Sequence, residues 1–153
     1  MFFQILKPYL YAQNQQQSEM KLDHVGIAVD NLPESNLLFE RLLGAPPYKE
    51  ETVTGENVKV SFFQTGDTKL ELLQALTEDS PIAKFLSKHK PGIHHLAFKV
   101  EDVALAAVEM EKSGFEVLTN PPKIGADNKL VVFLHPKTTN GVLIELCQEL
   151  KQQ

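Results

Sequence analysis

Apolar and polar residues alternate in the same way at two places in the chain. The segment DHVGIAVDNL at 23–32 aligns with HHLAFKVEDV at 94–103, an offset of 71 residues. In both segments every second residue is apolar, which is typical of a strand that buries one face. An acidic turn ends each segment. The alignment therefore predicts a repeated unit that begins with a strand.

Each of these strands leads into a predicted amphipathic helix. In the first copy Pro33 suits the first helical turn and Gly44 suits the helix end. In the second copy Asp102 suits the N-cap and Gly114 follows the last turn. The apolar stripes expected on the two helices are Leu37, Leu38, Leu42 and Leu43 in the first and Val103, Ala106, Ala107 and Met110 in the second.

Strand-like runs follow each helix and complete the repeat. They cover 58–64, 69–76, 130–134 and 141–146. Between the two copies Ser80-Pro81 opens a short helix, and Pro91-Gly92 ends it. We therefore expect one domain over 21–150 with internal pseudo-twofold symmetry. Its parts are module one at 21–78, a connector helix at 80–90 and module two at 93–150.

Residues 1–20 differ from the rest of the chain. They combine an aromatic start, Lys7-Pro8 and a Gln/Asn-rich tract. A secretory signal needs a basic start and an uninterrupted apolar core, and this segment has neither. We expect a disordered or artefactual leader; the alternative is a short extra helix or strand that packs on a partner subunit.

Composition and charge narrow the class of protein. The 153 residues are 42% hydrophobic with a formal net charge of -5, which suits a soluble globular chain and argues against a nucleic-acid surface. Cys147 is the single cysteine, so an internal disulfide is excluded and a reducing compartment is indicated. No apolar run approaches the roughly 18 residues of a membrane span. We therefore expect a cytoplasmic protein with no membrane or nucleic-acid partner.

Strand alternation places four polar residues together on the face opposite the helices. In the first copy His24 shares a face with Gly26 and Ala28, because side chains alternate along a strand. His95 holds the matching position in the second copy. Glu71 and Glu145 follow the two histidines by 47 and 50 residues, each in a strand whose apolar residues point the other way.

A metal site is the functional interpretation of this pattern. One strand histidine alone is more often a hydrogen-bonded or surface residue, but here two histidines and two acids recur in register. Imidazole and carboxylate donors suit Zn, Co, Ni, Mn or Fe, and the lack of thiolates disfavours a purely structural zinc site. His89 and His135 lack this register and are expected at the surface. Lysines at 123, 129 and 137 are expected to be solvated, unless they meet an anionic ligand.

From about residue 21 to 149 the chain resembles the vicinal oxygen chelate superfamily and, within it, the methylmalonyl-CoA epimerases. The stretches that carry the resemblance are DHVGIAV, GDTKLELLQAL followed by DSPIAKFL, GIHHLAF, and FLHPK with GVLIEL. The resemblance implies an α+β fold of two tandem βαβββ modules, with a metal-holding cleft between curved mixed sheets. It also implies a homodimer.

The resemblance assigns a role to each candidate residue. His24, His95 and Glu145 fall on three metal ligands, and Glu71 falls on the fourth position. One divalent ion (Co, Zn, Mn or Ni) is implied, with Co favoured. A further carboxylate proposed as a catalytic base lies in EETVTGENVKVSFF, where Glu56 is the candidate. The loop PPKIGADNK departs from a more glycine-rich family pattern at Asp127 and Asn128, which bears on substrate specificity.

The implied reaction is epimerisation of (2R)- and (2S)-methylmalonyl-CoA by alpha-proton abstraction through a metal-stabilised enolate. Glu145 and Glu56 are the candidates for the two proton-transfer groups. Lys123 and Lys137 are candidate contacts for the CoA thioester substrate. Two other readings stay open: a lactoylglutathione lyase-like enzyme with the same metal set, and a noncatalytic binding protein of the bleomycin-resistance kind.

Overall fold

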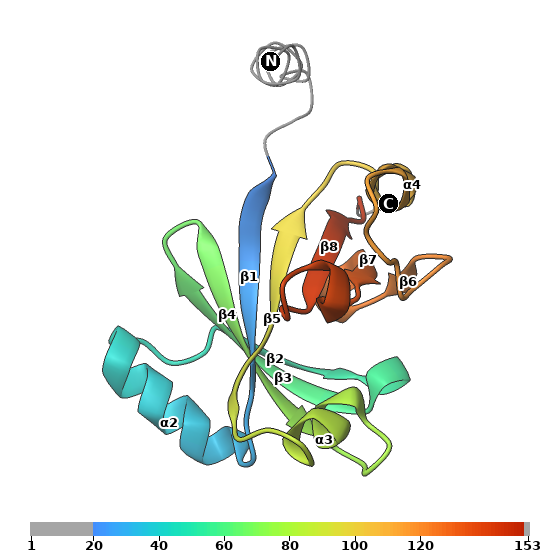
Figure 1. The fold of residues 1–153 in the computed structure, drawn as a ribbon. Coiled ribbons are helices and arrows are strands. Elements are labelled where there is room, and N and C mark those ends of the chain that lie inside the picture. Colours follow the sequence, from blue (N-terminus) through green and yellow to red (C-terminus); the bar gives the residue numbers. More distant parts are fainter. Residues whose placement is uncertain (1–19, 152–153) are drawn as a thin grey trace, which may run out of the picture.

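The computed structural model describes residues 20–151 (Figure 1). The predicted leader at 1–20 lies, apart from Met20, outside the described residues. Within the described part, strands and helices follow the order β-α-β-β-β twice, with a short helix between the two sets.

The first set contains β1 (Lys21–Ala28), α2 (Leu32–Leu43), β2 (Lys49–Val53), β3 (Val58–Thr65) and β4 (Thr68–Ala75). The short helix α3 (Pro81–Leu86) follows. The second set contains β5 (Gly92–Lys99), α4 (Val103–Lys112), β6 (Lys123–Ile124), β7 (Lys129–Leu134) and β8 (Ile144–Glu149). Three 3-10 turns, Thr54–Glu56, Ala126–Asn128 and Pro136–Thr138, lie in the connections.

All eight strands form one curled sheet in the order β2-β3-β4-β1-β5-β8-β7-β6. The order is symmetric about the antiparallel β1–β5 pair, because β1 pairs in parallel with β4 as β5 does with β8. The predicted α+β fold of two βαβββ modules is confirmed. The two module sheets join into a single sheet, and the domain boundaries assigned from the sequence stay a prediction.

The two long helices cover the convex face of the sheet, one on each module. Leu32 and Phe39 of α2 pack with Val29, Phe63 and Leu72. On the other module α4 packs its buried residues against Val132 and Leu146. The N-cap predicted for α4 is confirmed, because Asp102 accepts from the backbone N–H of Leu105. The N-cap of α2 is Asn31, which was not predicted and which accepts from the backbone N–H of Glu34.

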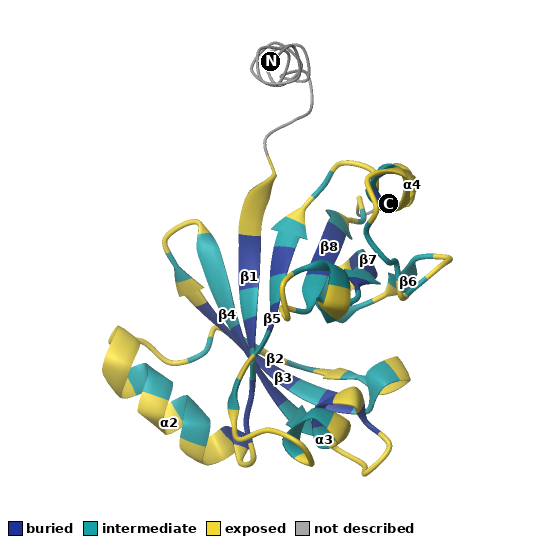
Figure 2. Ribbon diagram, viewed as in Figure 1, coloured by how far each residue is buried: buried dark blue, intermediate teal, exposed yellow. Residues whose placement is uncertain are grey.

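One predicted apolar stripe is wrong. Leu37, Leu38 and Leu42 of α2 are 64%, 54% and 71% exposed, and Leu43 is exposed as well. The helix turns Leu32 and Phe39 toward the sheet instead, so leucines lie on its outer surface. Much of α2 is exposed (Figure 2). The stripe predicted for α4 is confirmed, since Val103, Ala106 and Ala107 are buried and Met110 packs against them.

The last strand is shifted relative to the sequence prediction. The run at 141–146 was expected to be a strand, but β8 starts at Ile144 and continues to Glu149. Asn140 and Gly141 both have positive φ angles and form a turn, which delays the start of the strand.

Candidate metal and acid–base site

The concave face of the sheet carries the polar residues that the repeat brought into register. His24 lies opposite Ala97 across the β1–β5 pair, and His95 lies opposite Gly26. On the outer neighbours, Glu71 of β4 pairs with Gly26, and Glu145 of β8 pairs with Ala97. Each acid therefore flanks the small residue that faces a histidine, in both modules.

Three of these side chains meet at one point. The Nε2 atoms of His24 and His95 lie 3.1 Å apart. A carboxylate oxygen of Glu145 lies 3.7 Å from His24 Nε2, and its second oxygen lies 3.4 Å from His95 Nε2. All three residues are buried, and their donor atoms all lie within 4.8 Å of one another.

This donor set fits a divalent ion. With bond lengths of about 2.0–2.1 Å, donors that share one ion lie roughly 3–3.4 Å apart, close to the spacing observed here. Two imidazoles and a carboxylate suit Zn, Co, Ni, Mn or Fe. Burial raises the pKa of Glu145 to about 7 and also raises the pKa of Glu71. A bound cation would relieve this cost of burying carboxylates.

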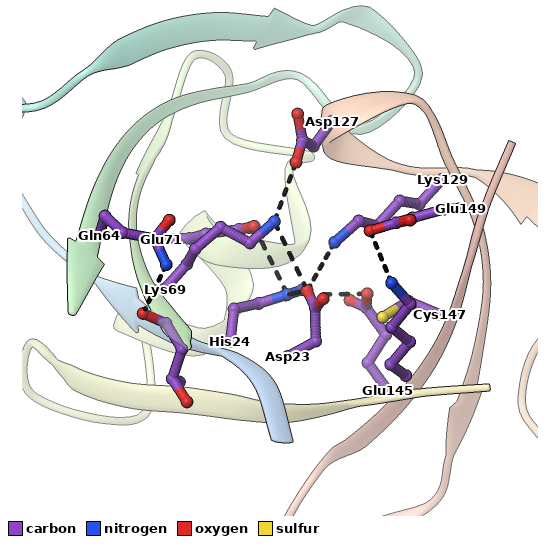
Figure 3. A network of polar contacts seen from close by, with 12 residues as sticks. Asp23, His24, Gln64, Lys69, Glu71, Asp127, Lys129, Glu145, Cys147 and Glu149 are labelled. Carbon is purple, nitrogen blue, oxygen red and sulfur yellow. Dashed lines mark hydrogen bonds and ion pairs between the residues drawn. The ribbon is translucent and has the colours of Figure 1, made fainter. Parts of the chain in front are cut away.

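Glu71 is buried beside His24 but approaches it from the other side of the ring. Its Oε1 lies 3.5 Å from His24 Nδ1, whereas the other donors face Nε2. Among the described residues, two groups of three donors could hold an ion: His24, His95 and Glu145, and Asp23, His24 and Cys147. Glu71 belongs to neither group. Figure 3 shows Glu71 above His24 and Glu145 to its right. The role of Glu71 as a fourth metal ligand stays a prediction.

The two histidines have opposite electrostatic environments. Burial lowers the pKa of His95 well below its ordinary value, and the charge of His24 lowers it further. Burial also acts to lower the pKa of His24, but Glu71, Asp23 and Glu145 outweigh it and raise that pKa. His95 is therefore neutral and can bind a cation directly. His24, whose pKa is raised, holds a proton more strongly and has to lose it before it can bind a cation.

A cavity of about 230 Å³ opens beside the three-donor group. Glu71, His95 and Glu145 form part of its wall, and so do Glu56 and Lys123. The rest is mostly apolar, as in pockets that bind small molecules: Val53, Val58, Leu73, Pro81, Ile82, Leu118, Val131, Phe133 and Leu143.

Glu56 and Lys123 form an ion pair at the cavity wall, between the 3-10 turn after β2 and the start of β6. The ammonium of Lys123 also lies 5.7 Å from the centre of the Phe133 ring. Lys137 is elsewhere: it pairs with Glu116 at 2.5 Å, is exposed, and is absent from the described lining of the cavity.

Lys129 corrects the sequence prediction. It was expected to be solvated, but it is only 2% exposed, and its ammonium donates to Asp23 Oδ2 at 2.5 Å. A lysine is almost never fully buried without such a partner. Asp23 was not singled out from the sequence, because strict alternation along the strand assigns it to the face opposite His24. The sequence analysis therefore missed this pair.

Further lysines and acids join the two modules beside this pair. Asp127, in the glycine-poor loop, accepts from Lys49 and Lys69 at 3.0 Å each. Its backbone N–H donates to Glu51. Burial acts to raise the pKa of Asp127, but the two lysines outweigh it and hold that pKa below its ordinary value. These contacts tie the loop of one module to the β2 and β4 strands of the other.

The architecture of two βαβββ modules around a buried histidine and glutamate group has clear relatives. Residues 23–133 match the Glyoxalase/Bleomycin resistance protein/Dioxygenase superfamily. The human mitochondrial methylmalonyl-CoA epimerase is 41% identical over 129 residues, which cover 84% of this chain and 73% of the human protein. The ethylmalonyl-CoA/methylmalonyl-CoA epimerase of Cereibacter sphaeroides is 43% identical over 130 residues, covering 84% of this chain and 97% of that protein.

Solved structures agree with these sequence matches. A variant of the Streptomyces coelicolor methylmalonyl-CoA epimerase, in complex with 2-nitronate-propionyl-CoA, aligns with a TM-score of 0.81. It is 31% identical, and the match covers 88% of this chain and 100% of the other. This chain therefore belongs to the glyoxalase/bleomycin resistance protein/dioxygenase superfamily and, within it, to the methylmalonyl-CoA epimerase family. Within residues 20–151, no helix is long and apolar enough to cross a membrane.

Proposed function

We propose that this epimerase interconverts (2R)- and (2S)-methylmalonyl-CoA by removing the alpha proton and delivering a proton to the opposite face. The observation that carries the proposal is that Glu56 and Glu145, from different modules, line one cavity beside the buried histidine and glutamate group. Inversion at carbon requires protonation on the face opposite to the one that lost its proton, and two proton-transfer groups on opposite sides achieve this. Similarity to relatives named for this reaction supports the choice of substrate.

His24, His95 and Glu145 are the residues that would hold the divalent ion, with Glu71 as the fourth candidate. When bound, the ion supplies Lewis-acid stabilisation for negative charge that develops on the substrate oxygens. Co is the metal favoured by the family resemblance, and the nitrogen and oxygen donors also suit Zn, Mn or Ni.

The chain's own residues move the proton. Glu145 lies in the metal group and Glu56 lies in the 3-10 turn after β2, and both line the cavity, so each is proposed to face one side of the bound alpha carbon. General acid–base groups of this kind contribute about 10²–10⁴-fold each. The apolar wall excludes water, which strengthens the electrostatic interactions inside the cavity. Lys123, already at the wall, is the proposed contact for an anionic group of the substrate.

Deuterium incorporation tests the proposal directly. Purified protein would be incubated with (2R)- or (2S)-methylmalonyl-CoA in D₂O, before and after removal of metal, and the alpha position would be followed by mass spectrometry. We expect rapid exchange that is lost with a chelator and restored by added Co²⁺. No exchange above background with the metal-loaded protein would refute the epimerase proposal.

Two further substrates sharpen the result. Ethylmalonyl-CoA measures how far the cavity accepts a longer acyl group. The hemithioacetal of glutathione and methylglyoxal tests the lactoylglutathione lyase reading, and turnover of it in place of exchange would support that reading. A homodimer and a cytoplasmic location belong to the same proposal, and sedimentation equilibrium of the full chain tests the former.

A further inference from the structure

The two ligand histidines are preceded by residues that break the regular alternation of their strands. In the β1–β5 pairing, the register steps from Leu22 to His24 and passes over Asp23. A second step, from Gly26 to Ile27 on β1, matches a step from His95 to Ile93 on β5 and passes over His94. Such bulges re-aim side chains, and they are frequent next to active sites.

Each bulge residue contacts the histidine that follows it, through the same ring atom. His24 Nδ1 donates to Asp23 Oδ2 at 2.7 Å. In the second module, the Nδ1 atoms of His94 and His95 lie 3.0 Å apart. Asp23 and His94 occupy equivalent positions in the repeat. The pseudo-twofold symmetry of the sheet therefore extends to the residues that contact Nδ1 of the two histidine rings.

These contacts leave the Nε2 atoms of both rings facing inward. A histidine that binds a metal through one nitrogen needs the proton on the other, and a hydrogen bond to that proton sets both the tautomer and the ring angle. Asp23 is well suited to accept this proton, because Lys129 and Lys69 lie 2.5 and 3.7 Å from its Oδ2 and keep the carboxylate charged. Figure 3 shows Asp23 between His24 and the two lysines.

We propose that Asp23 and His94 are positioning residues, which hold His24 and His95 with the proton on Nδ1 and the Nε2 lone pair directed at the metal. The inference rests on the proposed metal site. Asp23 has the larger effect of the two, because a charged acceptor makes the stronger hydrogen bond. Lys129 acts one step further out, since its buried ammonium fixes the carboxylate.

Metal affinity and ring tautomers, both read without substrate, test this proposal. Co²⁺ affinity would be measured by competition with a chelator, and the tautomers by long-range ¹H–¹⁵N spectra of the metal-free protein. At alkaline pH, where the ring of His24 is neutral, we expect wild-type His24 to show a single tautomer with the proton on Nδ1. Loss of an outer-shell partner typically weakens metal binding about 10–100-fold, and we expect this for the double variant Asp23→Leu/Lys129→Met.

Three further variants make the result specific. Asp23→Asn keeps a neutral acceptor, so it should retain the tautomer and bind Co²⁺ with an affinity between those of the wild type and the double variant. His94→Phe keeps an aromatic ring but removes the nitrogen that contacts His95 Nδ1. It should abolish the single tautomer of His95 and leave that of His24 unchanged. Asp127→Asn is the matched control, because it removes a carboxylate from Lys69 without touching His24. It should bind Co²⁺ within about threefold of the wild type.

Double-variant binding within threefold of the wild type, with the His24 tautomer unchanged, would overturn the proposal. If the double variant does not fold, Asp23→Asn decides: affinity equal to that of Asp127→Asn would equally overturn it. A wild type that binds Co²⁺ but exchanges no alpha proton refutes the epimerase and leaves the positioning role standing. Variants that exchange the alpha proton fully and bind Co²⁺ with unchanged affinity would refute the positioning role and leave the epimerase proposal standing.

Discussion

The ring of His95 fills the space that a side chain at position 26 would occupy. A Cβ atom built on Gly26 would lie 2.2 Å from Cε1 and 2.5 Å from Nδ1 of His95. The two residues are direct partners in the β1–β5 pair. Glycine is therefore required at position 26 by close approach: its absent side chain lets the second histidine reach the first.

Gly26→Ala should weaken metal binding while the fold is kept. The added methyl group has to displace the His95 ring from its place beside His24, so we expect at least about a tenfold loss of Co²⁺ affinity, comparable to losing support for a ligand. Chelator competition measures the affinity, and circular dichroism checks the fold. Gly92→Ala is the matched control on β5, because the nearest atom to its Cβ is 3.9 Å away. Equal affinity for both variants would contradict this reading.

The roles of Glu56 and Glu145 should be distinguishable by the stereochemistry of proton exchange. With one base on each face of the alpha carbon, Glu56→Gln should still exchange the proton of the epimer that faces Glu145, but without inversion. Its turnover should fall by about 10²–10⁴-fold, with Co²⁺ affinity near that of the wild type. Chiral analysis of the deuterated product in D₂O gives the measurement.

Glu145→Gln is the informative counterpart, because it removes the proposed metal ligand and the proposed base together. We expect it to lose alpha-proton exchange and to bind Co²⁺ more weakly. Full exchange in Glu145→Gln would refute its catalytic role, and inversion by Glu56→Gln at the wild-type rate would refute the two-base arrangement.

Much of the fold follows from the sequence repeat. The aligned strands became β1 and β5, the central pair of the sheet, and their alternation correctly assigned Ile27 and Val29 to the helix-covered face. The edge strands were not separately predicted. β2 has five residues, all of them partly or fully exposed, and β6 has only two residues. Their own sequences therefore carry little strand signal, and pairing with β3 and β7 determines where they form.

The residues of the candidate site could be predicted less completely than the fold, for a physical reason. Strict alternation assigns His24, His95 and Glu145 to one face, and the structure brings these three together. The same rule fails for Asp23, because a bulge turns two consecutive residues to the concave side. With Asp23 misplaced, the burial of Lys129 could not be foreseen either. The alignment of Asp23 with His94 was the available signal, since both directly precede a histidine.

The core between α2 and the convex face of the sheet should contribute strongly to stability. Leu72 is fully buried between β4 and this helix, so Leu72→Ala should lower the free energy of unfolding by about 2–5 kcal/mol. Leu42→Ala changes the same residue type on the exposed side of α2, and it should alter stability by no more than about 0.5 kcal/mol. Urea unfolding of both variants gives the comparison, and similar losses would mean that the leucine face of α2 is covered in solution.

Lys123 and Lys137 should differ in their effect on substrate. Lys123 lines the cavity and pairs with Glu56, whereas Lys137 is exposed and pairs with Glu116. Lys123→Met should raise KM for methylmalonyl-CoA several-fold, and Lys137→Met should leave it close to the wild-type value. Steady-state kinetics at low and high salt measures both. A larger effect at Lys137 would place the CoA contact on the β7–β8 connection instead.

Metal affinity should rise with pH across neutrality. Burial raises the pKa of Glu145 to about 7 in the metal-free protein, so below pH 7 this carboxyl is mostly protonated and has to lose its proton to bind an ion. The pKa of His24 is raised as well, mainly by Glu71 against the opposing effect of burial, and its proton competes in the same sense. Co²⁺ affinity should therefore fall as pH drops from 8 to 6, by up to about tenfold per unit for each proton displaced.

Calorimetric titration of the metal-free protein with Co²⁺, in buffers of different ionisation enthalpy, counts the protons released. At pH 6 we expect the wild type to release more than one proton, from Glu145 and His24 together. Glu145→Gln removes one of the two groups, so it should release fewer protons and show a shallower pH dependence. A wild type that releases none would mean that both groups are already deprotonated before the ion arrives, and that the carboxylate of Glu145 is charged despite its burial.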